Sequence, residues 1–172
     1  FIDQIDTLIT PFSDEDFEAF QPEILLTFGG MVVSKRIKSF LRKYQPLEHW
    51  HVDELRAYDT YGTLSQHFKT YPDTFFGYLL DKNSVESNYK SSIETIWKSR
   101  VVHHKLYTNQ VPFSDFKVFD FISQNLPKDS QLQVSNSSAI RYIQLFDLDK
   151  SIEVFCNRGT SGIDGSTSTA IG

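Results

Sequence analysis

The segment Ile152-Glu-Val-Phe-Cys156 runs directly into Asn157-Arg-Gly-Thr-Ser-Gly-Ile-Asp-Gly-Ser-Thr-Ser-Thr-Ala-Ile-Gly172, and together they indicate the fold. The first segment is apolar and predicts a buried strand, and the second is a glycine- and hydroxyl-rich turn that opens a helix. A strand that passes through such a turn into a helix directs backbone N–H groups toward an anion. Arg158 adds a planar cation that can bind a carboxylate or phosphate through two hydrogen bonds.

The preceding residues complete a strand–helix–strand unit. A short strand is expected at residues 132–134 and a short helix at 138–146, ahead of the strand at 152–156. A second such unit lies near the beginning of the chain. There, the apolar run 24–28 predicts a strand buried on both faces, followed by a helix at 33–44 and a strand at 50–52. Both units predict parallel strands.

The remaining elements connect these two units. We expect short helices at 1–9 and 14–20, a helix over 64–80 that is interrupted at Pro72, and a polar surface linker at 81–90. A helix resumes near Ile93 and breaks at Pro112, and Ser114 can cap a further helix that ends before Pro127. The fold class is therefore α/β, with Rossmann-like, three-layer segments of parallel sheet. Neither segment has enough strands for a complete doubly wound sheet, so we expect a piece of a larger protein.

Composition narrows the possible partners. The formal net charge of -5 provides no global basic field for a nucleic acid or an anionic membrane. No apolar run approaches the roughly 18 residues of a membrane span. A single cysteine, Cys156, excludes an internal disulfide and fits a reducing, cytoplasmic compartment.

Lys35 and Arg36 form the first candidate anion site. They lie in the first turn of the helix after strand 24–28, where cations oppose the helix dipole at a cost of roughly 0.3–1 kcal/mol each. A helix selected only for stability would carry Asp or Glu there. The alternative is a solvated basic stretch that continues through Lys38, Arg42 and Lys43.

The second and third candidates follow strands 132–134 and 152–156. Asn136, Ser137 and Arg141 follow the first of these strands, although Ser or Asn is also an ordinary helix cap. The terminal turn holds Arg158 and glycines at three-residue spacing, and the alternative is an ordinary tight turn. This turn matches neither the dinucleotide G-x-G-x-x-G pattern nor a Walker A loop. Because the two strands are expected to be parallel, Arg141 and Arg158 could converge on one polyanionic ligand.

Other reactive residues have simpler interpretations. His49 and His51 would share a strand face, but no third metal ligand is visible, so a core or surface pair is favoured. The pair His103 and His104 is expected at a solvent-exposed helix end. Cys156 is expected to be a core residue, because no base partner for a nucleophile is evident.

The terminal motif at 157–172 resembles the signature of the 2-succinyl-5-enolpyruvyl-6-hydroxy-3-cyclohexene-1-carboxylate synthase family. Ser135-Asn136-Ser137, with Arg141 five residues after the Asn, resembles that family's Asn-Ser-x-x-x-Arg segment. Ser34-Lys35-Arg36 resembles its Gly-Lys-Arg, with Ser in place of Gly. The spacing of the motifs also fits, so the resemblance covers nearly the whole chain.

The resemblance implies a thiamine-diphosphate enzyme of menaquinone biosynthesis, a transferase. Such an enzyme decarboxylates 2-oxoglutarate and adds the succinyl unit to isochorismate in a 1,4-addition. It also implies that residues 1–80 are the second half of a central domain, 81–112 a linker with a helix, and 113–172 the start of the diphosphate-binding domain.

Individual residues acquire roles from the same resemblance. It places Lys35, Arg36, Asn136, Arg141 and Arg158 at substrate and Ser137 and Ile163 at the cofactor, with Ile163 supporting the bent thiamine diphosphate. The catalytic glutamate and the segment that binds Mg²⁺ belong to parts of the family sequence that have no counterpart here. We therefore expect no catalytic or metal-binding residue in this chain, no activity from it alone, and a homo-oligomeric full-length enzyme. Another thiamine-diphosphate-dependent 2-oxo acid decarboxylase or synthase, or a non-catalytic α/β anion-binding module, remain alternatives.

Overall fold

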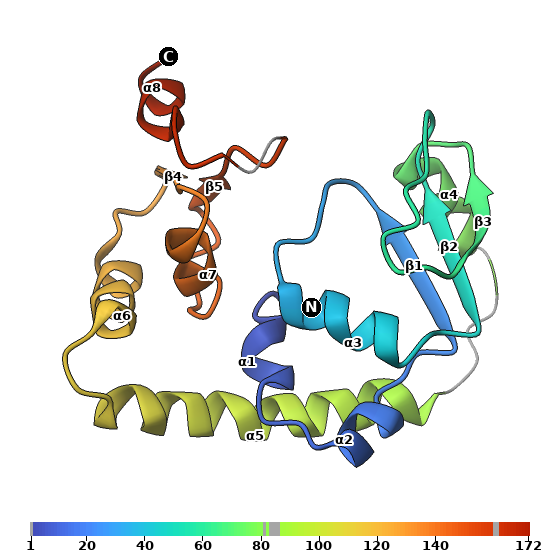
Figure 1. Ribbon diagram of the computed structural model, residues 1–172, viewed down its shortest axis with the longest axis horizontal. Coiled ribbons are helices and arrows are strands. Elements are labelled where there is room, and N and C mark those ends of the chain that lie inside the picture. Colours follow the sequence, from blue (N-terminus) through green and yellow to red (C-terminus); the bar gives the residue numbers. More distant parts are fainter. Residues whose placement is uncertain (1, 81, 83–86, 160–161) are drawn as a thin grey trace. The chain divides into compact units, whose positions relative to one another are not determined.

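The computed structural model describes residues 2–80, 82, 87–159 and 162–172. The chain divides into two compact units (Figure 1). Ile9–Trp97 forms the three-strand unit, named for its sheet. The two-strand unit consists of residues up to Leu8 together with Lys98–Gly172.

The three-strand unit is built on a parallel sheet in the order β1-β2-β3. The strands are β1 (Ile24–Phe28), β2 (Glu48–Val52) and β3 (Leu64–Phe68), and α3 (Lys35–Lys43) connects the first two. Ile24 pairs with Glu48 and Phe28 with Val52, so β1 and β2 are in register along their whole length. The predicted strand–helix–strand unit is confirmed.

The prediction of a helix over 64–80 is wrong in its first part. Residues 64–68 form β3, which pairs in parallel with β2, and Pro72 begins α4 (Pro72–Leu80) rather than interrupting a helix. Proline suits the first position of a helix because its missing N–H is not needed there. Sheet pairing of a five-residue segment outweighed the weak helical pattern.

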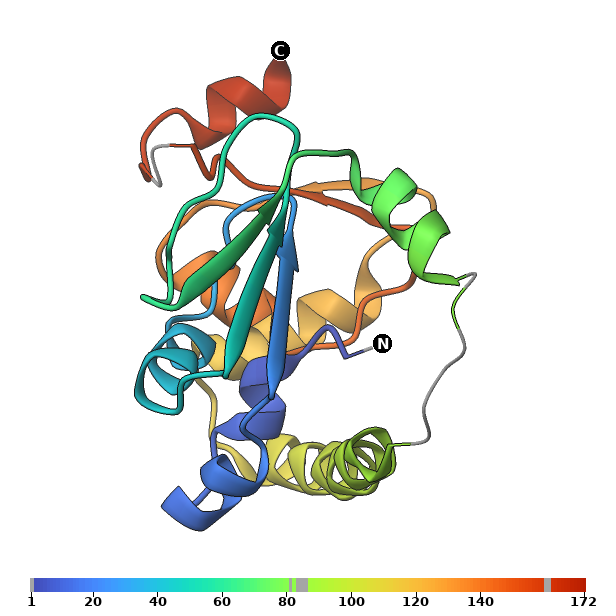
Figure 2. The same ribbon diagram turned by 90° about the vertical axis from the view of Figure 1, so that its right-hand side faces the viewer.

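The two faces of this sheet carry different side chains. One face carries Trp50, Phe68 and Phe28, whose rings contact one another or those of α4 in edge or tilted arrangements at centroid distances of 4.9–5.6 Å. In Figure 2, α3 and α4 lie on either side of the strands. β1 is an edge strand, and Ile24 and Phe28 are about half exposed, so the prediction of a strand buried on both faces is wrong.

An aromatic cluster joins α2 (Asp14–Ala19) to α3. Phe17 stacks on Tyr44, and Phe40 contacts both Phe17 and Phe20. Ser13 caps α2 through a complete capping box, because its hydroxyl accepts from the N–H of Asp16 while the Asp16 carboxylate accepts from the N–H of Ser13. These contacts fix the helix that carries Lys35 and Arg36.

The two-strand unit contains β4 (Gln131–Gln133) and β5 (Glu153–Phe155), which pair in parallel. The helices are α6 (Asp115–Asn125), α7 (Ser138–Ile143) and α8 (Ser166–Ile171); α1 (Ile5–Ile9) and α5 (Asn88–Gln110) each contribute residues to both units. The second predicted strand–helix–strand unit and the break before Pro112 are confirmed. The polar segment 81–90 is not a linker throughout, because residues 88–90 begin α5; residues 81 and 83–86 lie outside the described part.

The core of this unit forms around α6 and α7. Phe119 stacks on Tyr142 at 5.4 Å, and His104 lies edge-on to Phe116 and Phe146. His104 is therefore half-buried, contrary to the prediction of an exposed pair, and only His103 is exposed. β5 was predicted to be buried, yet Val154 and Phe155 remain over 40% exposed, because β4 is its only described neighbour.

Among the described residues, no helix is both long and apolar enough to cross a membrane.

Candidate functional site

The loops that follow β4 and β5 come together at one edge of the two-strand sheet. The parallel pairing continues one residue past β4, where the N–H of Val134 donates to the carbonyl of Phe155 at 2.8 Å. Residues 135–137 and 156–159 therefore leave the sheet side by side. This is the edge at which open parallel sheets bind ligands, and the convergence of Arg141 and Arg158 on one ligand stays a prediction.

Asn136 holds the two loops together. Its side chain is only 4% exposed, and its Nδ2 donates to the carbonyl of Asn157 at 2.7 Å and to that of Gly162 at 2.6 Å. Both amide hydrogens are thus used to fix the terminal turn. The Oδ1 of Asn136 accepts hydrogen bonds from Nη1 of Arg158 and, at 3.3 Å, from the thiol of Cys156.

Arg158 is held at one end of its guanidinium group. Its Nη1 donates to Asn136, while its buried Nε has no hydrogen-bond partner among the described residues. A buried donor without a partner is costly, and most native proteins satisfy it with a protein group, water or ligand. The side chain is half-buried, so a guanidinium oriented by Asn136 keeps donors for an anion.

The backbone beside Asn136 is strained. Ser137 has φ of 70° and ψ of -124°, an arrangement that is unusual for a residue with a side chain. Its hydroxyl makes no capping bond to α7, and the side chain is exposed. Strain of this kind persists only where neighbouring contacts impose it, and the buried Asn136 supplies those contacts.

The terminal turn presents an apolar side chain to solvent. Ile163 is 62% exposed, and Gly165, with φ of 78°, adopts a left-handed conformation that favours glycine. Asn157 ties the start of the turn to α8 through Thr169 at 3.0 Å. Gly159 has ordinary φ and open space around it, so the expected special backbone is seen at Gly165 but not at Gly159. Thr160 and Ser161 of this turn lie outside the described residues.

The other predicted basic residues are exposed. Arg141 lies on α7, and its side chain is exposed. Lys35 and Arg36 are the first two residues of α3, after the buried cap Ser34, whose hydroxyl accepts from the N–H of Ile37 at 3.0 Å. They belong to the three-strand unit, so their convergence with Arg158 stays a prediction.

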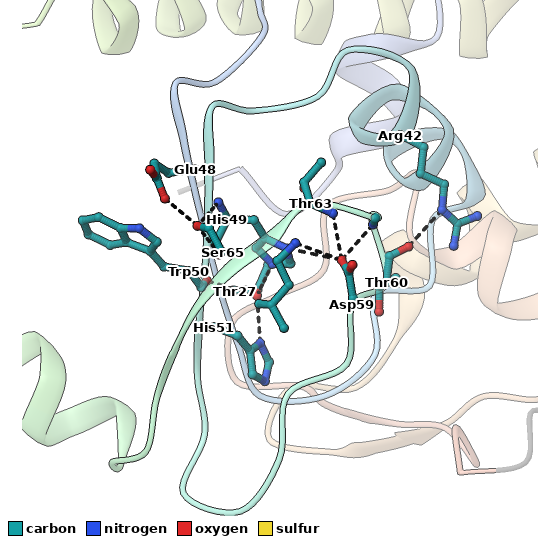
Figure 3. Close-up of polar contacts among 12 residues, drawn as sticks. Thr27, Arg42, Glu48, His49, Trp50, His51, Asp59, Thr60, Thr63 and Ser65 are labelled. Atoms are coloured by element: carbon teal, nitrogen blue, oxygen red, sulfur yellow. Dashed lines mark hydrogen bonds and ion pairs between the residues drawn. The ribbon is translucent and has the colours of Figure 1, made fainter.

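A second polar cluster lies in the three-strand unit (Figure 3). The hydroxyl of Thr27 lies 2.8 Å from Nε2 of His49 and 2.8 Å from Nδ1 of His51. The histidine pair is thus a strand-face pair, as predicted, but the role of Thr27 was missed. Its one signal was a lone polar residue within the apolar run Ile24–Phe28. Within the described ranges, no three or more His, Cys, Asp or Glu residues are grouped so that they could hold a metal ion.

Both a protein-family model and curated proteins match this chain. A family model described as "Middle domain of thiamine pyrophosphate" matches residues 8–134. The chain is also similar to proteins named 2-succinyl-5-enolpyruvyl-6-hydroxy-3-cyclohexene-1-carboxylate synthase. Identity is 62% with the one from Flavobacterium johnsoniae, 63% with that from Flavobacterium psychrophilum and 50% with that from Christiangramia forsetii.

Each of these alignments includes 100% of this chain and 31%, 32% and 31% of the respective relative. The chain therefore spans about a third of the length of the curated relatives it matches. The family model covers most of the chain, including the whole three-strand sheet and β4. On this evidence, the chain belongs to the family of middle domains of thiamine pyrophosphate enzymes.

Proposed function

We propose that this chain supplies part of a 2-succinyl-5-enolpyruvyl-6-hydroxy-3-cyclohexene-1-carboxylate synthase. The whole enzyme would decarboxylate 2-oxoglutarate and add the resulting four-carbon unit to isochorismate. Both substrates carry two carboxylates, so the site needs several cations. In this assignment, residues 1–80 belong to the central domain, 81–112 to a connection, and 113–172 to the start of the diphosphate-binding domain.

The observation that carries the proposal is the hydrogen-bonded pair Asn136 and Arg158. The buried amide orients the guanidinium at the carboxyl edge of parallel strands and leaves Nε without a described partner. A preoriented guanidinium loses little freedom when it binds a carboxylate through two hydrogen bonds. Arg158 is therefore assigned to a carboxylate of 2-oxoglutarate.

The other candidate residues are assigned to the same ligands. Arg141, Lys35 and Arg36 are exposed cations that would bind the remaining carboxylates of the two substrates. Ser137 and Ile163 would contact the cofactor. Ser137 has a strained backbone and an exposed side chain, and Ile163 is an exposed apolar residue. Both features suit a surface that a ligand covers. Thiamine diphosphate, when bound, supplies the electron sink for decarboxylation. We further propose that Mg²⁺ is bound outside the described residues, and that the enzyme is a cytoplasmic homo-oligomer.

A chimera tests this assignment. The 172 residues replace the aligned segment of the Flavobacterium johnsoniae relative, with which they share 62% identity. In this chimera, Arg158→Ala should lower kcat/KM for 2-oxoglutarate by about a hundredfold, since losing one partner of a desolvated charge pair costs about 2–5 kcal/mol. Arg158→Lys should recover only part of the loss, because Lys lacks the planar fork.

The matched control is Lys150→Ala, which removes an exposed cation from the same unit and should leave kcat/KM unchanged. An unchanged kcat/KM in Arg158→Ala would remove Arg158 from the site. A screen of other 2-oxo acids on the same chimera separates this synthase from other thiamine-dependent decarboxylases. Binding of dicarboxylates without any turnover would favour a non-catalytic anion-binding module.

A further inference from the structure

One hydroxyl group lies between two imidazole rings in the three-strand unit (Figure 3). Thr27 of β1 faces β2, and its Oγ1 is 2.8 Å from Nε2 of His49, 2.8 Å from Nδ1 of His51 and 3.3 Å from the carbonyl of Trp50. This cluster lies outside the proposed carboxylate site and shares no residue with it.

Counting hydrogens assigns a donor and an acceptor to each contact of the Thr27 hydroxyl. A hydroxyl has one hydrogen to donate and two lone pairs that accept. All three contacts are satisfied when Thr27 donates to the carbonyl of Trp50 and each imidazole donates its N–H to Thr27. In that arrangement Nε2 of His49 carries a hydrogen, so a neutral ring has its lone pair on Nδ1.

The Nδ1 atom of His49 is enclosed. The side chain is 1% exposed, Nδ1 has no hydrogen-bond partner among the described residues, and the ring of Tyr61 lies edge-on at 5.5 Å. The carboxylate of Asp59 is 4.0 Å away, too far for a hydrogen bond. Neutral Nδ1 tolerates this site, whereas a proton there would be a buried donor without an acceptor.

The Asp59 carboxylate accepts hydrogen bonds from the backbone of the turn in which it lies. Its Oδ1 accepts from the backbone N–H groups of Gly62 at 2.8 Å, Thr63 at 2.9 Å and Leu64 at 3.1 Å. These bonds fix the turn that leads into β3. The only described acid that faces His49 is therefore the residue that holds this turn closed.

The surrounding charges act in opposing directions. Burial lowers the pKa of His49, Asp59 opposes this shift, and His51 reinforces it. Burial likewise lowers the pKa of His51, which faces Asp53 and His67. Arg42 of α3 donates to the carbonyl of Thr60. Burial raises the pKa of Tyr61, and the charge of Arg42 opposes this shift.

We propose that His49 and Asp59 form a proton-operated latch on the turn between β2 and β3. While His49 is neutral, Asp59 binds the N–H groups of residues 62–64 and the turn is closed. When a proton from solvent binds Nδ1, the new imidazolium can be satisfied only if the Asp59 carboxylate moves to it. That movement releases the three N–H groups and loosens the start of β3.

Hydrogen exchange of the 172-residue chain tests the latch. Protection of the Gly62, Thr63 and Leu64 amides should be constant above the pKa of His49 in the open turn, which pairing with the Asp59 carboxylate raises above the ordinary histidine value of about 6.5. Below it, protection should fall by up to about tenfold per pH unit, as linkage to one proton requires. The change should follow the titration of His49 measured by NMR, while amides in β1 keep their protection.

Two variants separate the latch from general acid denaturation. His49→Gln retains an amide that can bind Thr27 but cannot be protonated, and Asp59→Asn retains an oxygen for the turn but loses the charge. Both should abolish the pH response at residues 62–64, whereas the exposed control His103→Gln should respond as the wild type. Protection that is independent of pH in the wild type would overturn the proposal, as would an unchanged response in Asp59→Asn.

Discussion

Asn136 contributes to stability by bonding to two separate segments of the terminal turn and to Arg158. Asn136→Ala leaves two carbonyl groups and a guanidinium hydrogen without their partner. We expect the free energy of unfolding to fall by about 2 kcal/mol, since an unsatisfied buried polar group costs about 1–3 kcal/mol. Urea denaturation monitored in the two-strand unit measures this change.

Asn125→Ala is the matched control. The Asn125 amide also donates to a backbone carbonyl, that of Phe121, but it is exposed and bonds within a single helix. Its replacement should change the free energy of unfolding by less than about 0.5 kcal/mol. Equal effects of the two substitutions would show that Asn136 does not join the loops.

Individual site residues differ in how far the sequence predicts them. Arg158 and Asn136 could be brought together from sequence, because both follow short strands of one parallel pair. The hydrogen bonds of the Thr27 hydroxyl to His49 and His51 could not be predicted from sequence, because they depend on the pairing of Thr27 with His51 across β1 and β2. The pattern of apolar residues predicts the two strands but not which residues pair between them.

At the scale of the element, the beginning of α3 combines a cap with two cations. Ser34 caps the helix, and Ser34→Ala should lower the free energy of unfolding by about 1 kcal/mol. Ser34→Gly, which restores the residue of the family motif, should cost only a few tenths of a kcal/mol because glycine is also a good cap. Thermal denaturation should give this order, with Ser39→Ala in the exposed middle of α3 as a control; an equal loss in Ala and Gly would contradict it.

Lys35 and Arg36 should reduce the stability of the helix that they begin. Both are exposed in its first turn, where the dipole favours acids, so Lys35→Glu and Arg36→Glu should each stabilise α3 by about 0.3–1 kcal/mol. In the chimera, the same changes should raise KM for isochorismate. Steady-state kinetics together with denaturation measures both effects. Higher stability with unchanged kinetics would support the alternative of a solvated basic stretch.

The sequence predicts the elements of this chain better than their burial. Both strand–helix–strand units were recognisable from apolar runs between turn residues. The exposure of β1 and β5 could not be recognised in this way, because it depends on how many strands flank them. β3 was missed because Leu64–Phe68 is short and its pairing with β2 is a tertiary contact.

The whole chain spans about a third of the length of its curated relatives. We therefore expect the 172-residue chain alone to release no carbon dioxide from 2-oxoglutarate in the presence of thiamine diphosphate and Mg²⁺. Calorimetry should likewise detect negligible cofactor binding. Turnover, or micromolar affinity for the cofactor, would contradict the assignment of residues to domains.

Product formation by the chimera with the Flavobacterium johnsoniae relative tests whether this chain supplies part of the synthase. Supplied with 2-oxoglutarate, isochorismate, thiamine diphosphate and Mg²⁺, the chimera should form 2-succinyl-5-enolpyruvyl-6-hydroxy-3-cyclohexene-1-carboxylate, detected by mass spectrometry. Arg158→Ala should nearly abolish that product while the protein remains folded. A folded chimera that forms no product, or one in which Arg158→Ala forms it at the unchanged rate, would contradict the account.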